Sequence, residues 1–151
     1  MPFNFASAVA GNAIMLAALL AVMLGVGFVC QSQRNKNRAL SNALNNMSQG
    51  LCMFDRQARI IVTNKRYLEM YSLSPKIVRR GCTLRDLMRH RQEVGLFNGD
   101  VDEYCRSIIE SLSKGDQASF YVQASDGRIV HALNHVTPGG GWISTHEDVT
   151  E

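Results

Sequence analysis

The stretch that decides the fold runs from Ser119 to Val149 and reads SFYVQASDGRIVHALNHVTPGGGWISTHEDV. It holds three apolar runs that are bounded by turn residues. Asp126-Gly127 separates the first two runs, and this pair favours a tight hairpin turn because glycine accepts a positive φ. The segment Pro138–Gly141 separates the second run from the third. The stretch therefore predicts three consecutive antiparallel strands.

Two further strands are predicted upstream. LCMF (51–54) and RIIVT (59–63) are apolar runs that DRQA separates, which is the pattern of a hairpin. Before them, apolar residues recur at the spacing of a helix face and end at Gly50. These residues are Leu40, Ala43, Leu44 and Met47.

Three or four short helices are predicted between the two groups of strands, because several helix-start signals follow one another. These signals are Asn64 ahead of a helix through Tyr71, Ser74-Pro75 ahead of a short helix that ends at Gly81, Thr83 with Asp86, and Asp100 with Glu103. Two strands, these helices and three more strands can close one five-stranded antiparallel sheet with the helices on one face. The predicted fold class is α+β.

The N-terminal part carries a separate signal. Residues 13–30, AIMLAALLAVMLGVGFVC, contain no charged or amide side chain, and a helix of this length spans a bilayer core of about 30 Å. A signal peptide or a buried core helix is the alternative, but no Lys or Arg precedes the run and it has no polar face. We expect a tail over 1–12, a transmembrane helix over 13–30 (a start near residue 6 is also compatible), a basic linker over 31–39 and a folded domain over 40–151.

The distribution of charge predicts the location of this domain. Arg34, Lys36 and Arg38 flank only the C-terminal side of the run, so that side is expected in the cytoplasm, with the protein single-pass in the inner membrane. Without these three residues, the chain has as many basic as acidic side chains. A neutral domain argues against nucleic-acid binding. We interpret the local group of arginines as a solvated helix face; its members are Arg79, Arg80, Arg85, Arg89 and Arg91.

Several segments of residues 40–151 resemble the PAS domain, in the bacterial type that precedes diguanylate cyclase or histidine kinase modules. They are NMSQGLCMFD, VTNKRYLEMYSLSP, GCTLRDL, GLF and GGGWISTHEDVTE. The last segment is similar to the family's Asp-Ile-Thr exit motif, here Asp148-Val149-Thr150. The resemblance implies a PAS fold that is complete at Glu151, with an output domain following in relatives. It also implies that Asp148 and Thr150 form the signal exit.

No catalytic or metal site is predicted. His146-Glu147 begins like the metalloprotease motif H-E-x-x-H, but Thr150 stands where the second His is needed. His131 and His135 are four residues apart on a predicted strand, which separates them by about 13 Å, too far for one metal ion. Four cysteines (Cys30, Cys52, Cys82 and Cys105) form no CxxC pair, and we expect reduced thiols.

The resemblance leaves the cofactor unknown. Relatives that form a flavin photoadduct carry a Cys just after the helix-opening Asn, whereas Lys65 follows Asn64 here. Relatives that bind haem use a His on the helix before the third strand, and residues 100–114 contain none; Cys105 is expected in the core and His90 at the surface. A cavity between sheet and helices is expected to suit a small organic ligand. Candidate polar contacts are Asn64, Tyr67, His131 and His135.

Two functions are compatible with these observations. The first is a membrane-tethered sensory and dimerisation module without catalytic activity of its own. The second is the input segment of a larger signalling enzyme, a diguanylate cyclase or histidine kinase, whose output domain lies beyond residue 151. A cofactor-based redox sensor is a third option. A homodimer is expected through the 40–47 stripe and a ridge of small residues, which allows close helix approach in lipid. The ridge consists of Ala13, Ala17, Ala21 and Gly25.

Overall fold

The computed structural model describes residues 5–114, 118–123 and 126–151. In chain order the elements are α1 (Phe5–Asn45), β1 (Gly50–Phe54), β2 (Ile60–Thr63), α2 (Lys65–Met70), α3 (Leu84–Glu93), α4 (Val101–Ser113), β3 (Ala118–Gln123), β4 (Ile129–Val136) and β5 (Trp142–Asp148). The chain divides into two compact units, of which the second runs from Ala43 to Glu151. The predicted α+β class is confirmed.

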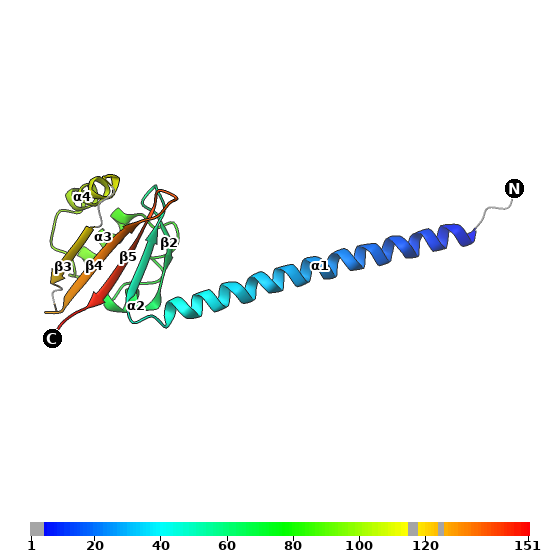
Figure 1. Ribbon diagram of the computed structural model, residues 1–151, viewed down its shortest axis with the longest axis horizontal. Helices are drawn as coiled ribbons and strands as arrows, with labels where there is room; N and C mark the ends of the chain where they lie inside the picture. Colours follow the sequence, from blue (N-terminus) through cyan, green and yellow to red (C-terminus); the bar gives the residue numbers. More distant parts are fainter. Residues whose placement is uncertain (1–4, 115–117, 124–125) are drawn as a thin grey trace. The chain divides into compact units, whose positions relative to one another are not determined.

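The second unit contains one antiparallel sheet with the strand order β2-β1-β5-β4-β3 (Figure 1). Both predicted strand groups are present. The last strand in sequence, β5, lies between β1 and β4 and so joins the two groups into one sheet. Cys52 pairs with Ser144, and Ser144 pairs with Asn134. All three are buried, so they share the inner face of the sheet. The buried side chains of α2, α3 and α4 cover this face and complete the core.

Glycines fix the two turns of this meander. Gly127 has a φ of 89°, as the predicted hairpin turn requires. At Gly141 a Cβ atom would run into the carbonyl oxygen of Phe54. Only glycine therefore lets β5 enter the sheet beside β1.

The predicted helix caps at Asn64, Thr83 and Asp100 are confirmed. The Asp100 side chain, for example, accepts a hydrogen bond of 2.8 Å from the backbone N–H of Glu103. The predicted short helix between Ser74 and Gly81 is wrong, because this segment forms turns. Gly81 N donates to Ile60 O and Ile60 N donates to Cys82 O, each at 2.8 Å. These bonds to the edge strand β2 hold the end of the segment, and only its first turn, where Val78 N donates to Ser74 O, has a helix-like hydrogen bond.

The first unit ends at Asn42 and contains most of α1, which continues without a break through the predicted linker 31–39. Within residues 5–114, 118–123 and 126–151, no helix combines the length and the apolar character needed to cross a membrane. The predicted transmembrane helix over 13–30 is therefore not supported. The side chains of Ala13 and Ala17 lie outside the described residues; Ala21 and Gly25 are exposed.

Candidate functional site

A small cavity lies between the inner face of the sheet and the helices. Its volume is about 20 Å³, which suffices for about one water molecule. Apolar side chains form much of its wall. The polar members are Tyr67, Arg91, Tyr104, Asn134, Ser144 and His146.

Arg91 is the charged member of this wall. It lies in the last turn of α3 and is only 4% exposed. Its guanidinium carbon is 3.8 Å from the centre of the Tyr71 ring, a cation–π contact. The buried Nε atom has no hydrogen-bond partner in the described part of the chain. The expectation of a solvated Arg91 is wrong.

The neighbouring His90 is also buried, which corrects the expectation that it is exposed. Its Nε2 accepts a hydrogen bond of 3.3 Å from Ser74 N, and its Nδ1 lies 3.2 Å from Glu93. The side chain therefore contacts the 74–81 turn and its own helix. It is not part of the cavity wall.

His146 connects the cavity to α2. It is 5% exposed, and its two ring nitrogens lie 2.8 Å from the hydroxyls of Tyr71 and Ser144. Its ring also makes edge contacts with the rings of Tyr67 and Tyr71. Burial, and to a smaller extent the charge of Arg91, lower the pKa of His146 to about 3. The imidazole is therefore neutral at physiological pH, with one nitrogen as donor and the other as acceptor.

Asn134 supplies the second unpaired polar group. Its Oδ1 atom is buried and accepts no hydrogen bond from any described residue. Asn134 lies on β4 directly opposite Ser144 on β5. The cavity wall thus contains an unpaired donor on Arg91 and an unpaired acceptor on Asn134. Buried polar atoms without partners are uncommon in folded proteins, and the cavity beside these two residues has room for about one water molecule.

Of the four predicted ligand contacts, Tyr67 lines the cavity. Asn64 is buried but stands outside the cavity wall, and its hydrogen-bonding groups are used within the fold. Its Oδ1 accepts from Leu51 N (2.8 Å) and Tyr67 N (3.0 Å), and its Nδ2 donates to two carbonyl oxygens at 2.9 Å. These carbonyls belong to Leu44 and Gln49. Asn64 therefore caps α2 and fixes it to the start of β1.

His131 and His135 lie on the other face of β4. The buried residues of this strand are Val130, Ala132 and Asn134, and neighbouring side chains on a strand alternate between faces. His131 Nε2 lies 2.9 Å from Ser119 Oγ, and its ring stacks on Tyr121. The structure therefore brings neither histidine into the cavity.

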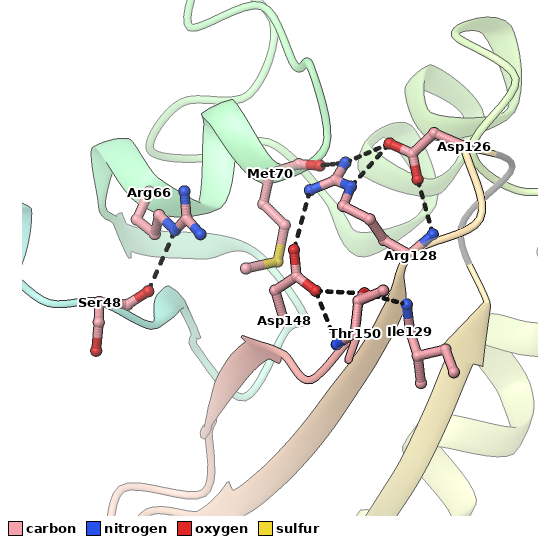
Figure 2. Close-up of polar contacts among 8 residues, drawn as sticks. All are labelled: Ser48, Arg66, Met70, Asp126, Arg128, Ile129, Asp148 and Thr150. Atoms are coloured by element: carbon pink, nitrogen blue, oxygen red, sulfur yellow. Dashed lines mark hydrogen bonds and ion pairs between the residues drawn. The ribbon is translucent and has the colours of Figure 1, made fainter.

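The predicted signal exit forms a second polar cluster, at the end of β5 (Figure 2). Asp148 Oδ1 accepts hydrogen bonds from the backbone N (3.2 Å) and hydroxyl (2.6 Å) of Thr150. Thr150 Oγ1 in turn accepts from Ile129 N at 2.9 Å. The hydrogen bonds from Thr150, more than the nearby charge of Arg128, lower the pKa of Asp148. The carboxylate is therefore ionised and orders the residues that follow β5.

Arg128 connects this exit cluster to α2. Its Nη2 donates to the carbonyl oxygen of Met70 at 2.6 Å, and its Nη1 lies 3.9 Å from Asp148 Oδ2. Asp126 holds the same guanidinium from the β3–β4 turn (Figure 2). Met70 ends α2, and the next residue is Tyr71, which contacts His146. The C-terminal end of α2 is thus connected to β5 in two ways, directly through Tyr71 at the cavity and indirectly through Arg128 at the exit.

Comparison with known proteins gives the family context. A family model described as the PAS fold matches residues 44–151. The non-motile and phage-resistance protein of Caulobacter vibrioides is 24% identical over 120 residues, which are 80% of this chain and 13% of that protein. The chain therefore spans a small part of the length of this relative.

Solved structures show the same fold. The PAS domain of BvgS from Bordetella pertussis is 17% identical with a TM-score of 0.53, covering 78% of this chain and 88% of that chain. The PAS domain of the quorum-sensing receptor RpfR from Cronobacter turicensis, in complex with C12:0, is 16% identical with a TM-score of 0.51. That comparison covers 70% of this chain and 97% of that one.

Proposed function

Because this chain belongs to the PAS fold family, which matches residues 44–151, we propose that it is a sensory module of bacterial signalling. In this proposal a small molecule binds in the buried cavity, and β5 carries the resulting change to the residues after Asp148. One observation carries the proposal. The end of α2 contacts β5 at the cavity, through Tyr71 and His146, and at the exit, through Met70, Arg128 and Asp148.

The coupling follows from these contacts. His146 and Asp148 are two residues apart on β5, so both move when this strand shifts or tilts. A ligand that displaces Tyr71 or His146 alters the end of α2, and Arg128 transmits that change to Asp148. The end of α2 and β5 would then have two arrangements, one before and one after this displacement. Ligand binding can shift the equilibrium between them only if they bind the ligand with different affinity. The unpaired groups on Arg91 and Asn134 would provide that difference if only one arrangement satisfies them.

The solved relatives support a small-molecule ligand. Two structures of the RpfR PAS domain are described as complexes, one with BDSF and one with C12:0. Identities near 16% establish the shared fold only. The residues that would bind a ligand in this chain are therefore inferred from its own cavity.

We also propose that the chain forms a homodimer through α1 and acts at the inner membrane, with the PAS domain in the cytoplasm. The support is the uncharged run 13–30, the adjacent basic residues and the apolar side chains that α1 leaves exposed, such as Met23 and Phe28. An exposed apolar surface of this kind is typical of a site that contacts lipid or a protein partner. Alkaline carbonate extraction tests the location and cross-linking tests the dimer. Recovery in the soluble fraction, or a monomer at all concentrations, would refute the respective proposal.

We propose no catalytic activity for this chain. The alternative is that it is the input segment of a diguanylate cyclase or histidine kinase. The reading frame beyond residue 151 distinguishes the two, since a diguanylate cyclase would show G-G-[D/E]-E-F. In either case, the expected role of residues 44–151 is the same.

The coupling can be tested with two reporters that the chain already contains. Trp142 is the single tryptophan and lines the cavity, so its fluorescence reports ligand binding. The amide of Ile129 donates to Thr150, so its hydrogen exchange reports the exit. A ligand found by fluorescence should change both signals in the wild type and only the first in Arg128→Met. Unchanged exchange at Ile129 in the saturated wild type would exclude the proposed exit.

A further inference from the structure

We propose that the cavity between the sheet and the helices binds a single water molecule, which accepts a hydrogen bond from Arg91 Nε and donates one to Asn134 Oδ1. This inference goes beyond the proposed function and does not depend on it, because it concerns the protein without a ligand. It starts from these two buried polar atoms, neither of which has a partner among the described residues.

The two atoms are complementary and come from different layers of the fold. Arg91 belongs to α3 and Asn134 to β4, and both side chains are buried and line the cavity. Arg91 Nε can only donate a hydrogen bond, and Asn134 Oδ1 can only accept one. Since both atoms lack a partner within the described parts of the chain, they do not bond to each other. A hydrogen-bonded connection between them therefore needs a molecule that both accepts and donates.

The size and polarity of the cavity suit water. Its volume is about 20 Å³, and a water molecule needs about 10–15 Å³ of such free space together with two to four polar partners. Arg91 and Asn134 supply two partners. The hydroxyl groups of Tyr67, Tyr104 and Ser144 belong to the same wall, and a hydroxyl can either donate or accept.

The charge of Arg91 makes a partner for Nε important. A buried donor without an acceptor is unfavourable, and more so when the donor is charged. Arginine cannot lose its proton, and the cavity wall contains no Asp or Glu among the described residues. The ring face of Tyr71 and the C-terminal turn of α3 stabilise the charge, but neither accepts a hydrogen bond from Nε. Water supplies that acceptor without a second buried charge.

The bound water would connect α3 to the sheet. His146 already bonds to the hydroxyls of Tyr71 and Ser144, and Ser144 lies directly opposite Asn134 in the sheet. The water would join Asn134, and with it β4, to Arg91 on α3. Any molecule that enters the cavity must then displace the water and replace both of its hydrogen bonds, or it leaves Arg91 and Asn134 unpaired.

A monatomic anion such as chloride is the competing occupant, because Arg91 carries a positive charge. Chloride can accept a hydrogen bond from Nε, but it has no proton to donate to Asn134 Oδ1. It would therefore satisfy one of the two atoms and leave the other unpaired. Water satisfies both, so the unpaired acceptor favours water over an anion.

The experiment uses the full chain, isotope-labelled and without ligand. Nuclear magnetic resonance should detect magnetisation transfer between the Nε–H proton of Arg91 and a long-lived bound water. Relaxation dispersion of water oxygen should then show one such water fewer in Asn134→Leu, which removes the acceptor and fills the cavity. Asn98→Leu is the matched control, because Asn98 is exposed and outside the cavity wall, and it should keep the water.

Three results would overturn the inference. The first is an Arg91 Nε–H proton without a water contact in the wild type, and the second is the same number of long-lived waters in the wild type and Asn134→Leu. The third is a shift of the Nε–H resonance when gluconate replaces chloride at constant ionic strength, which would indicate a bound anion. The first and third need only the wild type, so they decide the question even if Asn134→Leu does not fold. A dry cavity would leave the proposed sensory function open, and failure to find a ligand would leave the water in place.

Discussion

Acidification should weaken the folded protein through His146. The folded state lowers the pKa of His146 from its ordinary value of 6.5 to about 3, mainly by burial. Above pH 6.5 this histidine is neutral in both the folded and the unfolded state, and the fold has its full stability. Between pH 6.5 and pH 3 the unfolded state binds a proton that the folded state does not, so the unfolding free energy falls as the pH falls. Each pH unit in this window corresponds to about 1.4 kcal/mol of unfolding free energy. A change from pH 7.5 to pH 5 should therefore cost about 2 kcal/mol at this residue.

Urea denaturation at a series of pH values measures this dependence. The quantity compared is the slope of the unfolding free energy against pH in wild type and variant, because other groups also titrate between pH 5 and pH 7.5. His146→Gln removes the titrating group, so its stability should depend less on pH than that of the wild type, by about 1.4 kcal/mol per unit below pH 6.5. His135→Gln is the matched control for a histidine-to-glutamine substitution, since His135 lies on the other face of the sheet. Equal slopes for wild type and His146→Gln would refute the reasoning.

Three further predictions concern stability and can be measured by the same method. Asn64→Ala removes a helix cap and the four hydrogen bonds of a buried side chain, and should cost about 3 kcal/mol of unfolding free energy; a loss below about 1 kcal/mol would contradict its role in the fold. Gly141→Ala should lower the unfolding free energy by more than about 3 kcal/mol, because the added Cβ meets the Phe54 carbonyl oxygen. A near-neutral effect would contradict the close contact between these two backbone segments. Tyr71→Phe leaves His146 Nδ1 without its hydroxyl partner and should cost about 1–3 kcal/mol, whereas an unchanged stability would mean that water replaces the bond.

The strands and caps were predictable because their signals are local. The Asp100 cap depends on a few adjacent residues and is present as predicted, and Gly127 has the positive φ that its turn signal predicts. The Ser74–Gly81 segment has an equally good local start signal, but after one turn its backbone leaves the helical path and Gly81 bonds to β2. No local sequence pattern indicates that the backbone of a distant strand will compete with the helical hydrogen bonds of this segment.

The cavity residues were harder to predict because their burial depends on which face of an element is covered. On β4, both alternating sets contain apolar residues: Ile129 and Leu133 in one, Val130 and Ala132 in the other. The sequence does not say which set faces the helices, and Asn134 belongs to the buried one. Arg91 had a signal that was available. It lies seven residues after Leu84 and extends the spacing of Leu84, Leu87 and Met88, so it continues the buried stripe of α3.

The position of β5 has a consequence for synthesis of the protein. This strand pairs with β1 across nearly a hundred residues, from Gly50 to His146, and without it the sheet separates into two independent hairpins. Contacts this distant in sequence form slowly. The nascent domain therefore cannot close while Trp142 to Asp148 are still inside the ribosome. Until then, the inner faces of both hairpins are exposed, and during that interval the chain is most vulnerable to aggregation and most dependent on chaperones.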